Sequence, residues 1–404
     1  MEKKRSGILN LIKSNVSGDL TIVLLVLILS LFGIIMVFSA SYYVSINESG
    51  TPYAYLRRQL LWFVIGLAAM IVISRIDYHF WMNFTPIFYL VGLGLLVALF
   101  IPGLGVTING ATRWIGLGPI TIMPGEIAKI TLIFYLSGIL AKNPDMIRYV
   151  SGVAGVVLTT GIYAALILEQ PNMSTAATVV FIAGGLMLVA GAKIWQLLLL
   201  AGLGFAGGVA LIFSSEYRHD RFLSFLDPFA DSLGNGFQAV QSLLALGTGG
   251  FTGQGLGNSV QKYLYLPEPQ NDFITAIIGE ETGFIGLMLL MSLYILLIWR
   301  GCKAAMNAPD FYGMMLAAGI SVMVGVQVCI NIAVVTSSMP PTGVILPFVS
   351  YGGNALMLLM ALMGVMWNVT RQSEKKQIKQ LTERNLEALE ADRQKLIKRT
   401  VKQR

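Results

Sequence analysis

The sequence predicts an all-α polytopic membrane protein with about ten transmembrane helices, and three observations support this fold class. Hydrophobic residues make up 55% of the 404 residues. Only 12% are charged, which is half of the roughly 25% typical of soluble domains. Apolar runs long enough to cross a bilayer, about 20 residues for a helix, recur along the chain. Their continuity favours helices over a β-barrel, and their abundance argues against a soluble multidomain enzyme and against disorder.

Ten apolar runs are the candidate membrane spans, and their ends are expected to be accurate to about three residues. Gln59–Ser74 and Thr175–Ala190 are the shortest. No internal repeat of the kind found in many transporters is visible in the sequence. The runs are Leu20–Ser39, Gln59–Ser74, Phe80–Ile101, Gly125–Ala141, Tyr149–Leu168, Thr175–Ala190, Ile194–Phe213, Phe273–Trp299, Phe311–Val335 and Thr342–Trp367.

Lys and Arg residues in the connections predict the orientation of these spans. With ten spans both termini lie on one side, and that side collects 21 basic residues against 6 on the other, with Lys129 inside a span. The termini are therefore expected in the cytoplasm, with an extracytoplasmic loop at residues 214–271 between the seventh and eighth spans. The expected organisation is a basic N-terminus (1–19), a transmembrane domain (20–370) and a basic tail (371–404).

The formal net charge of +7 belongs to the termini. After Thr370 the chain holds 11 basic and 5 acidic residues, and residues 1–19 hold 4 basic and 2 acidic ones, which leaves −1 for the rest. The basic balance is thus a topology signal, and we expect no nucleic-acid partner. Apolar residues among the tail's charges predict a helix. That helix lies against anionic lipid, binds a cytoplasmic partner, or is a solvated charged segment.

Charges and irregular backbone at membrane depth point to function. In the outer loop before the fourth span, Pro124 suits a first helical turn. Glu126 and Lys129 share a helix face. They either form a local ion pair or line a polar cavity in which Lys129 binds an anionic group. The turn Glu169–Ser174 is explained as well by a helix boundary as by a functional site.

The long outer loop ends in a carboxylate of particular interest. Its glycine run at 247–257 does not fit the dinucleotide-binding pattern, and instead allows tight turns or close approach of a ligand. Asp272 opens the eighth span, either as its N-cap or as a general base at the outer membrane edge. Glu280 and Glu281 lie two turns deeper, where burial requires partners, so they are structural or line a cavity.

The strongest physical pointer to a site is residues 340–354, at the start of the tenth span. Three prolines and three glycines there predict a broken or re-entrant helix, which is tolerated only where it packs in protein or faces water. Searches for zinc-hydrolase, G-x-S-x-G and P-loop motifs find none in this sequence.

Together these motifs resemble the SEDS family (shape, elongation, division and sporulation), over about 360 residues. The sequence around Gln261–Glu268 is most similar to the division and sporulation branch. The matching segments are Asn109-Gly110-Ala111, Arg113-Trp114-Ile115, Pro124 with Glu126 and Lys129, Gln170-Pro171, Gln238 with Gln241-Ser242, the glycine run, Tyr265-Leu266-Pro267-Glu268, Asp272-Phe273, and residues 340–353.

The resemblance implies a peptidoglycan glycosyltransferase in the bacterial cytoplasmic membrane, with an extracytoplasmic active site. Such proteins polymerise lipid II, an undecaprenyl-diphosphate disaccharide-pentapeptide, during division or sporulation. They work with a class B penicillin-binding protein, a transpeptidase, and with other divisome or sporulation proteins. The essential aspartate of the family falls on Asp272.

The chemistry of this reaction suits the residues present. A sugar hydroxyl that attacks an anomeric carbon needs a base, here Asp272, and the departing diphosphate needs cations or donors. No metal ligand is assigned, and a divalent cation stays an open possibility. The candidate substrate-binding residues are Arg58, Arg113, Glu126, Lys129, Lys262, Glu268 and Ser350.

Three positions depart from the family pattern, and two other functions compete. Gly125 stands where the family commonly has Ser, Asn172 where it often has Asp, and Asn354 where it often has Ser. We therefore assign Asn172 no acid, base or metal role.

A lipid II flippase would carry polar groups along both faces of a pathway, whereas these motifs crowd the outer side. A non-catalytic scaffold for a transpeptidase would function without Asp272.

Overall fold

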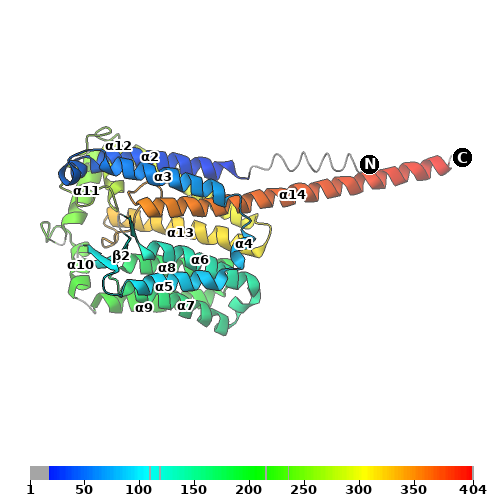
Figure 1. Cartoon of the computed structure of the whole chain (residues 1–404), viewed down its shortest axis with the longest axis horizontal. Helices are drawn as coiled ribbons and strands as arrows, with labels where there is room; N and C mark the ends of the chain where they lie inside the picture. The colour runs from blue at the N-terminus through cyan, green and yellow to red at the C-terminus, as the bar shows by residue number, and fades with distance from the viewer. Residues whose placement is uncertain (1–17, 109–110, 118–119, 214–215, 235, 403–404) are drawn as a thin grey trace.

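The computed structural model describes residues 18–108, 111–117, 120–213, 216–234 and 236–402. These residues form a bundle of helices with one small sheet (Figure 1). The helices and strands are α2 (Leu20–Ser49), α3 (Ala54–Ile73), α4 (His79–Met82), α5 (Thr85–Ala98), β1 (Gly105–Ile108), β2 (Ala111–Leu117), β3 (Ile120–Ile122), α6 (Pro124–Lys142), η1 (Pro144–Arg148), α7 (Val150–Leu168), α8 (Met173–Val189), α9 (Ile194–Phe213), α10 (Glu216–Leu226), α11 (Phe237–Gly249), α12 (Ile274–Met306), α13 (Phe311–Val335) and α14 (Gly353–Lys402).

A helix lies at each of the ten predicted runs, and the chain is a multi-pass membrane protein. Among the described residues, α2, α3, α6, α7, α12, α13 and α14 are long and apolar enough to cross a membrane, whereas α5, α8 and most of α9 are shorter apolar helices. Large apolar side chains cover the outside of the bundle, as contact with lipid requires. Leu158, Leu198 and Phe205, for example, are 65%, 68% and 76% exposed.

Two predicted helices have different bounds, and proline explains both differences. The run Phe80–Ile101 is divided into α4 and α5 near Asn83, where Pro86 fits the first turn of a new helix but not the interior of a continuous one. The tenth helix begins at Gly353 rather than Thr342, because the prolines at 340, 341 and 347 keep the preceding segment non-helical.

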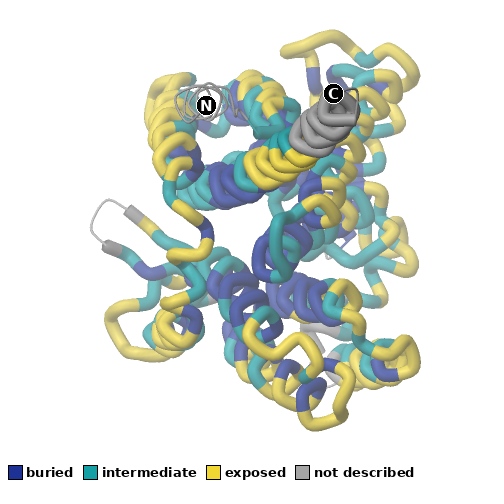
Figure 2. Tube along the Cα trace, turned by 90° about the vertical axis from the view of Figure 1, so that its right-hand side faces the viewer, coloured by how far each residue is buried: buried dark blue, intermediate teal, exposed yellow. Residues whose placement is uncertain are grey.

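The interior of the bundle is closely packed. Figure 2 shows the buried segments facing one another, with exposed segments around them. Helices α3 and α14 touch at glycine: a Cβ on Gly364 would lie 2.6 Å from the carbonyl oxygen of Met70, and one on Gly66 would lie 2.8 Å from the sulfur of Met360. Small residues at such crossings let membrane helices gain van der Waals contact, which drives their association in lipid.

The connection after α5 is a three-stranded antiparallel sheet, not the plain loop that the sequence suggested. Strand β2 pairs with both β1 and β3, and the register shifts between Val106 and Thr107. The hydroxyls of Thr107 and Thr112 lie 2.7 Å apart across the first pair. β-branched residues such as these favour strands.

The glycine run of the long loop packs against a break in α12. Gly283 has φ 68° and ψ −170° inside that helix, so the helical hydrogen bonds around it are interrupted. The carbonyls of Glu280 and Glu281 accept instead from the backbone N–H groups of Gln254 (2.9 Å) and Gly255 (3.0 Å). A Cβ on Gly253 would lie 2.2 Å from the Glu281 carbonyl oxygen. The glycines therefore permit close backbone contact within the protein.

The residues just before α2 and just before the basic tail meet at one end of the bundle. Asp19, just before α2, pairs with Arg300 near the end of α12 (3.2 Å), and its N–H donates to Thr370 of α14 (3.1 Å). Helix α14 then leaves the bundle and stays helical to Lys402. Helices α10 and α11 and strand β2 lie at the opposite end (Figure 1).

Candidate functional site

The proline–glycine loop, residues 340–352, lies at the end of the bundle that holds the sheet, because Asn354, just after the loop, donates to the carbonyl of Thr121 in β3 (2.7 Å). It joins α13 to α14 without helical structure, as the sequence predicted for this segment. Gly343 has φ 77°, a left-handed conformation that glycine adopts without steric cost. Phe348 also holds positive φ, at 66°, although it carries a Cβ. Such strain persists only where the surroundings fix the backbone, and it is common at functional sites.

Several elements hold this loop in place. Ser174 at the start of α8 donates to the carbonyl of Thr342 (2.5 Å), and Gln59 of α3 donates to the carbonyl of Ser350 (3.3 Å). The N–H of Tyr351 donates to the carbonyl of Gln270, two residues before Asp272 (2.9 Å). The loop is thus fixed by segments that are far apart in the sequence.

Asp272 lies against this loop, half-buried in a turn before α12. A Cβ on Gly343 would lie 3.7 Å from its Oδ2 atom, so the carboxylate faces the glycine of the loop. Helix α12 begins at Ile274 with Phe273 at the N-cap position. This is one residue later than an N-cap role for Asp272 requires.

Asn331 of α13, which is fully buried, connects Asp272 to the loop. Its Nδ2 atom donates to the carbonyl of Asp272 and to the carbonyl of Val344, both at 2.8 Å. Its Oδ1 atom accepts from the hydroxyl of Thr275 at 2.6 Å. One amide side chain therefore fixes the backbone on both sides of the contact. Sequence reasoning did not identify Asn331, although a lone amide inside an apolar span is a signal of function or structure.

Arg113 on β2 lies beside the turn before α8. Its Nε donates to the carbonyl of Gln170 (3.3 Å), and its Nη2 donates to the carbonyl of Pro171. Asn172 caps α8 by accepting from the N–H of Thr175 (3.2 Å), which agrees with the helix-boundary reading of this turn. Asn109 and Gly110 of the neighbouring motif lie outside the described residues.

Glu126 and Lys129 form the ion pair that their spacing suggested. Their charged atoms lie 2.7 Å apart, and the Lys129 side chain is 3% exposed. A buried cation is costly unless paired, so Glu126 explains how this lysine is tolerated.

Lys262 and Ser350 are internal braces. The Nζ atom of Lys262 lies 3.0 Å from a carboxylate oxygen of Glu281 and 3.1 Å from the hydroxyl of Ser39, and its side chain is 4% exposed. The Ser350 hydroxyl accepts from the N–H of Leu346 (2.8 Å) and is buried. These contacts favour structural roles, so neither residue is carried forward as a substrate ligand.

Glu280 organises the long loop from within. Its carboxylate accepts from the hydroxyl of Ser259 and from the N–H groups of Val260 (2.9 Å) and Gln261 (3.3 Å). Glu281 is paired through one oxygen with Lys262 and Ser39, whereas its Oε2 atom is buried without a hydrogen-bond partner among the described residues. Both glutamates tie the long loop to α12.

Glu268 and Arg58 lie at the surface of this end. Glu268 is exposed on one side and accepts from the amides of Asn271 (2.7 Å) and Gln270 (3.2 Å). Partial burial, together with the negative charge of Glu48, raises the pKa of the Glu268 carboxyl. Arg58 is exposed in the first turn of α3, and makes no side-chain hydrogen bond or ion pair among the described residues. No group of three or more His, Cys, Asp or Glu side chains in the described part of the chain is arranged to hold a metal.

Comparisons with known proteins identify the family of this chain. A family model described as "Cell cycle protein" and named for FtsW, RodA and SpoVE matches residues 19–375. Stage V sporulation protein E of Bacillus subtilis is 42% identical over 360 residues, covering 88% of this chain and 98% of the relative. A probable peptidoglycan glycosyltransferase FtsW of Geobacter sp. (strain M18) is 39% identical over 353 residues, covering 87% and 96%.

Solved structures show the same fold. One, described as "Structural coordination of polymerization and crosslinking by a peptidoglycan synthase complex", aligns with a TM-score of 0.72 at 27% identity, covering 88% of this chain and 98% of that one. The rod shape determining protein RodA of Thermus thermophilus aligns with a TM-score of 0.64 at 26% identity, covering 88% and 97%. The resemblance predicted from the motifs is therefore confirmed, and this chain belongs to the FtsW, RodA and SpoVE family of SEDS proteins.

Proposed function

We propose that this protein is a peptidoglycan glycosyltransferase that polymerises lipid II at the outer face of the bacterial cytoplasmic membrane, in division or sporulation. The observation that carries the proposal is the carboxylate of Asp272, fixed against an irregular loop at the end of the bundle away from the termini. The name of the Geobacter relative, a probable peptidoglycan glycosyltransferase, supports the same activity.

The proposed topology has ten spans, cytoplasmic termini and an extracytoplasmic loop at residues 214–271. The positive charge of the connections supports it. So does the grouping of basic residues around the two ends of the chain, where Arg300 pairs with Asp19 and Arg75 lies beside Arg371. Asp272 then lies on the outer side, where the lipid of the substrate stays in the bilayer while its sugars reach the proline–glycine loop.

In the proposed reaction, Asp272 accepts the proton of the attacking sugar hydroxyl. That oxygen forms a bond to the anomeric carbon of a second lipid-linked sugar, and the bond from this carbon to the diphosphate oxygen breaks. The diphosphate departs with the bonding electrons and needs positive charge where its own charge develops. Arg113 suits this role because its guanidinium stays positively charged while it donates to the carbonyls of Gln170 and Pro171. Arg58 and Lys129 are further cations at this end.

In the proposed reaction, the two acidic residues among the substrate-binding candidates, Glu126 and Glu268, have supporting roles. Glu126 holds Lys129 in position, and Glu268, with its raised pKa, is a hydrogen-bonding group for the sugars or peptide of the substrate.

The proposed partners are a class B penicillin-binding protein and other divisome or sporulation proteins. A complex that coordinates polymerisation with crosslinking is described for the aligned synthase, and this supports the transpeptidase partner.

Replacing Asn331 with alanine is expected to lower the kcat of polymerisation by roughly 10²-fold and to change the KM for lipid II little. The reason is that Asn331 holds the backbone of Asp272, and displacement of a reacting group by about 1 Å has an effect of this size. Ser321→Ala is the matched control, because Ser321 is buried in the same helix but donates only to the carbonyl of Ala317. Equal kcat values for the two variants would contradict a positioning role for Asn331.

The activity itself is tested by incubating the purified protein with fluorescent lipid II in detergent, with and without a partner transpeptidase. The proposal predicts ladders of glycan strands. A flippase would make no ladders in detergent, with or without the transpeptidase. In a separate assay with vesicles, it would move lipid II between the leaflets. A non-catalytic scaffold would do neither.

A further inference from the structure

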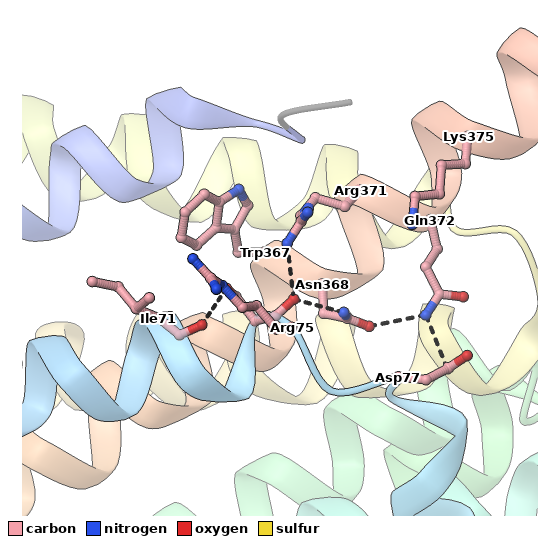
Figure 3. Close-up of a pocket in the computed structure, with 9 residues that line it drawn as sticks. Ile71, Arg75, Asp77, Trp367, Asn368, Arg371, Gln372 and Lys375 are labelled. Carbon is pink, nitrogen blue, oxygen red and sulfur yellow. Dashed lines mark hydrogen bonds between the residues drawn. The ribbon is translucent and has the colours of Figure 1, made fainter. Parts of the chain in front are cut away.

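A polar cavity lies at the end of the bundle opposite Asp272. It has a volume of about 690 Å³ and opens between the end of α3 and the point where α14 leaves the bundle. Figure 3 shows Arg75 and Arg371 next to Trp367, and Lys375 farther along α14. We call this cavity the basic pocket. The lining residues that matter here are Arg75, Asp77, Trp367, Arg371, Gln372 and Lys375.

The cations of the basic pocket have few partners inside the protein. Arg371 donates to one backbone carbonyl, that of Ser74 (3.3 Å). Arg75 and Lys375 are exposed, and among the described residues their side chains make no hydrogen bond or ion pair. An arginine fork carries five N–H donors, so most of the donor capacity of the pocket is available to a ligand.

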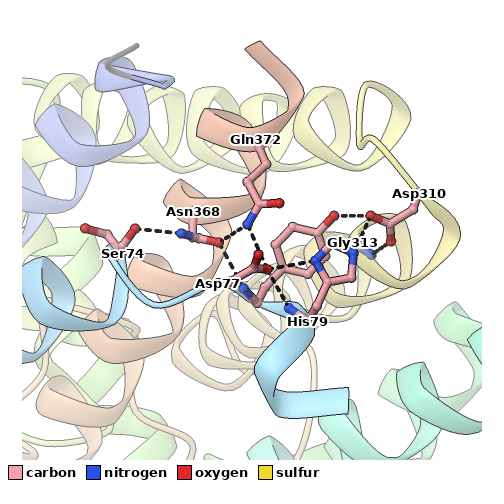
Figure 4. Close-up of polar contacts among 8 residues, drawn as sticks. Ser74, Asp77, His79, Asp310, Gly313, Asn368 and Gln372 are labelled. Carbon is pink, nitrogen blue, oxygen red and sulfur yellow. Dashed lines mark hydrogen bonds and ion pairs between the residues drawn. The ribbon is translucent and has the colours of Figure 1, made fainter. Parts of the chain in front are cut away.

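The lining of the pocket also contains one acidic side chain, Asp77, whose negative charge offsets part of the positive charge of these cations. One oxygen of Asp77 accepts from the N–H of His79 (2.9 Å) and the amide of Gln372 (2.9 Å), and lies 2.7 Å from the His79 ring (Figure 4). These hydrogen bonds outweigh the effect of burial and lower the pKa of the Asp77 carboxyl. The lining thus holds three cations and one anion, which leaves it with a net positive charge.

The position of the pocket suggests the origin of its ligand. Trp367 is the last aromatic residue of the apolar part of α14, and the charged tail begins at Arg371. Tryptophan is enriched where the hydrocarbon of a bilayer meets water. Basic pockets between membrane helices at this level bind the head groups of acidic lipids.

We propose that the basic pocket binds a phosphate group, supplied by the head group of an anionic phospholipid such as phosphatidylglycerol. Arg75 and Arg371 donate to the phosphate oxygens, and Lys375 adds positive charge at the rim. This site is separate from the polymerisation site, and under the proposed topology it draws its lipid from the cytoplasmic leaflet. A bound lipid there would join α3 to α14. Both helices also contact the proline–glycine loop, since Gln59 of α3 donates to the carbonyl of Ser350 and α14 begins directly after the loop.

The test measures lipid binding to the full-length protein in detergent by native mass spectrometry. Phosphatidylglycerol is titrated against phosphatidylcholine of the same chain lengths, and inorganic phosphate is titrated separately with Tm as the readout. We expect Arg75→Gln and Lys375→Gln each to weaken phosphatidylglycerol binding about fivefold, and the double variant about 25-fold. The control is Lys142→Gln, which removes an exposed cation from the end of α6, outside the pocket, and should change binding less than about twofold.

The outcomes separate the possible sources of phosphate. Preferential binding of phosphatidylglycerol that is lost in the double variant supports the proposal. Stabilisation by inorganic phosphate, lost in the same variant and without any lipid preference, supports a phosphate site that is filled by a soluble compound. Equal binding of both lipids and no response to phosphate would overturn the proposal, as would an equal loss in Lys142→Gln. Unchanged Tm values of the lipid-free variants show that they fold.

Discussion

Replacing Asp272 with alanine is expected to lower the rate of lipid II polymerisation about 10²- to 10⁴-fold, the usual contribution of a general base. The change removes the only group proposed to accept the proton of the attacking hydroxyl. The fold should persist, because Asn331 holds Asp272 through its backbone carbonyl, which alanine retains. Asp272→Asn should be nearly as inactive, since an amide of the same shape cannot accept that proton.

The measurement is the initial rate of glycan ladder formation by purified variants, with Tm recorded for each. The control is Asp227→Ala, which removes an exposed carboxylate from the long loop; that side chain accepts from the N–H of Ala230 (3.2 Å). The control should polymerise at the wild-type rate. An Asp272→Ala protein that made ladders within about twofold of wild type would remove Asp272 from the mechanism.

The second large effect concerns stability. Lys262→Met is expected to destabilise the protein by about 3–5 kcal/mol, because it leaves Glu281 as a buried charge without its cation. The two side chains are 4% and 0% exposed, and the remaining partner of that carboxylate is the hydroxyl of Ser39. The pair also fastens the long loop to α12. Thermal unfolding in detergent should therefore show a lower Tm and earlier proteolysis of residues 214–271.

A double-mutant cycle gives the control for this prediction. Adding Glu281→Gln to Lys262→Met removes the unpaired charge and should restore part of the lost stability. Lys379→Met breaks an exposed pair with Glu383, in which the charged atoms lie 3.9 Å apart. Such surface pairs contribute about 0.3–0.5 kcal/mol. A Lys262→Met protein no less stable than Lys379→Met would show that the buried pair is not a brace.

The helical fold was predictable because the bilayer imposes a simple rule on composition: apolar runs of span length become helices. Breaks within helices were harder to predict from the sequence. Pro86 signals the division between α4 and α5, but the kink at Gly283 depends on backbone groups from residues 250–255, which are distant in the sequence. The sheet around Arg113 has strands of three to seven residues, too short for a clear alternating pattern.

The site was predictable in its location but not in its supporting contacts. Asp272 and the proline–glycine loop were both identified from the sequence, and the structure places them together. Lys262 was a candidate for substrate binding in the sequence; its partner, Glu281, lies in a different segment, and only folding brings the two together. Asn331 has no motif around it, and its importance follows from three hydrogen bonds that join distant segments.

The most direct test of the central claim is polymerisation in proteoliposomes, with lipid II supplied only to the outer leaflet. Protease treatment of the tail gives the fraction of molecules whose tails are protected inside the vesicle. We predict that ladder formation rises with this protected fraction and is abolished by Asp272→Ala, because Asp272 lies at the end opposite the tail. Ladders that track the molecules with exposed tails, or that persist in Asp272→Ala, would contradict a polymerisation site at Asp272 on the extracytoplasmic side.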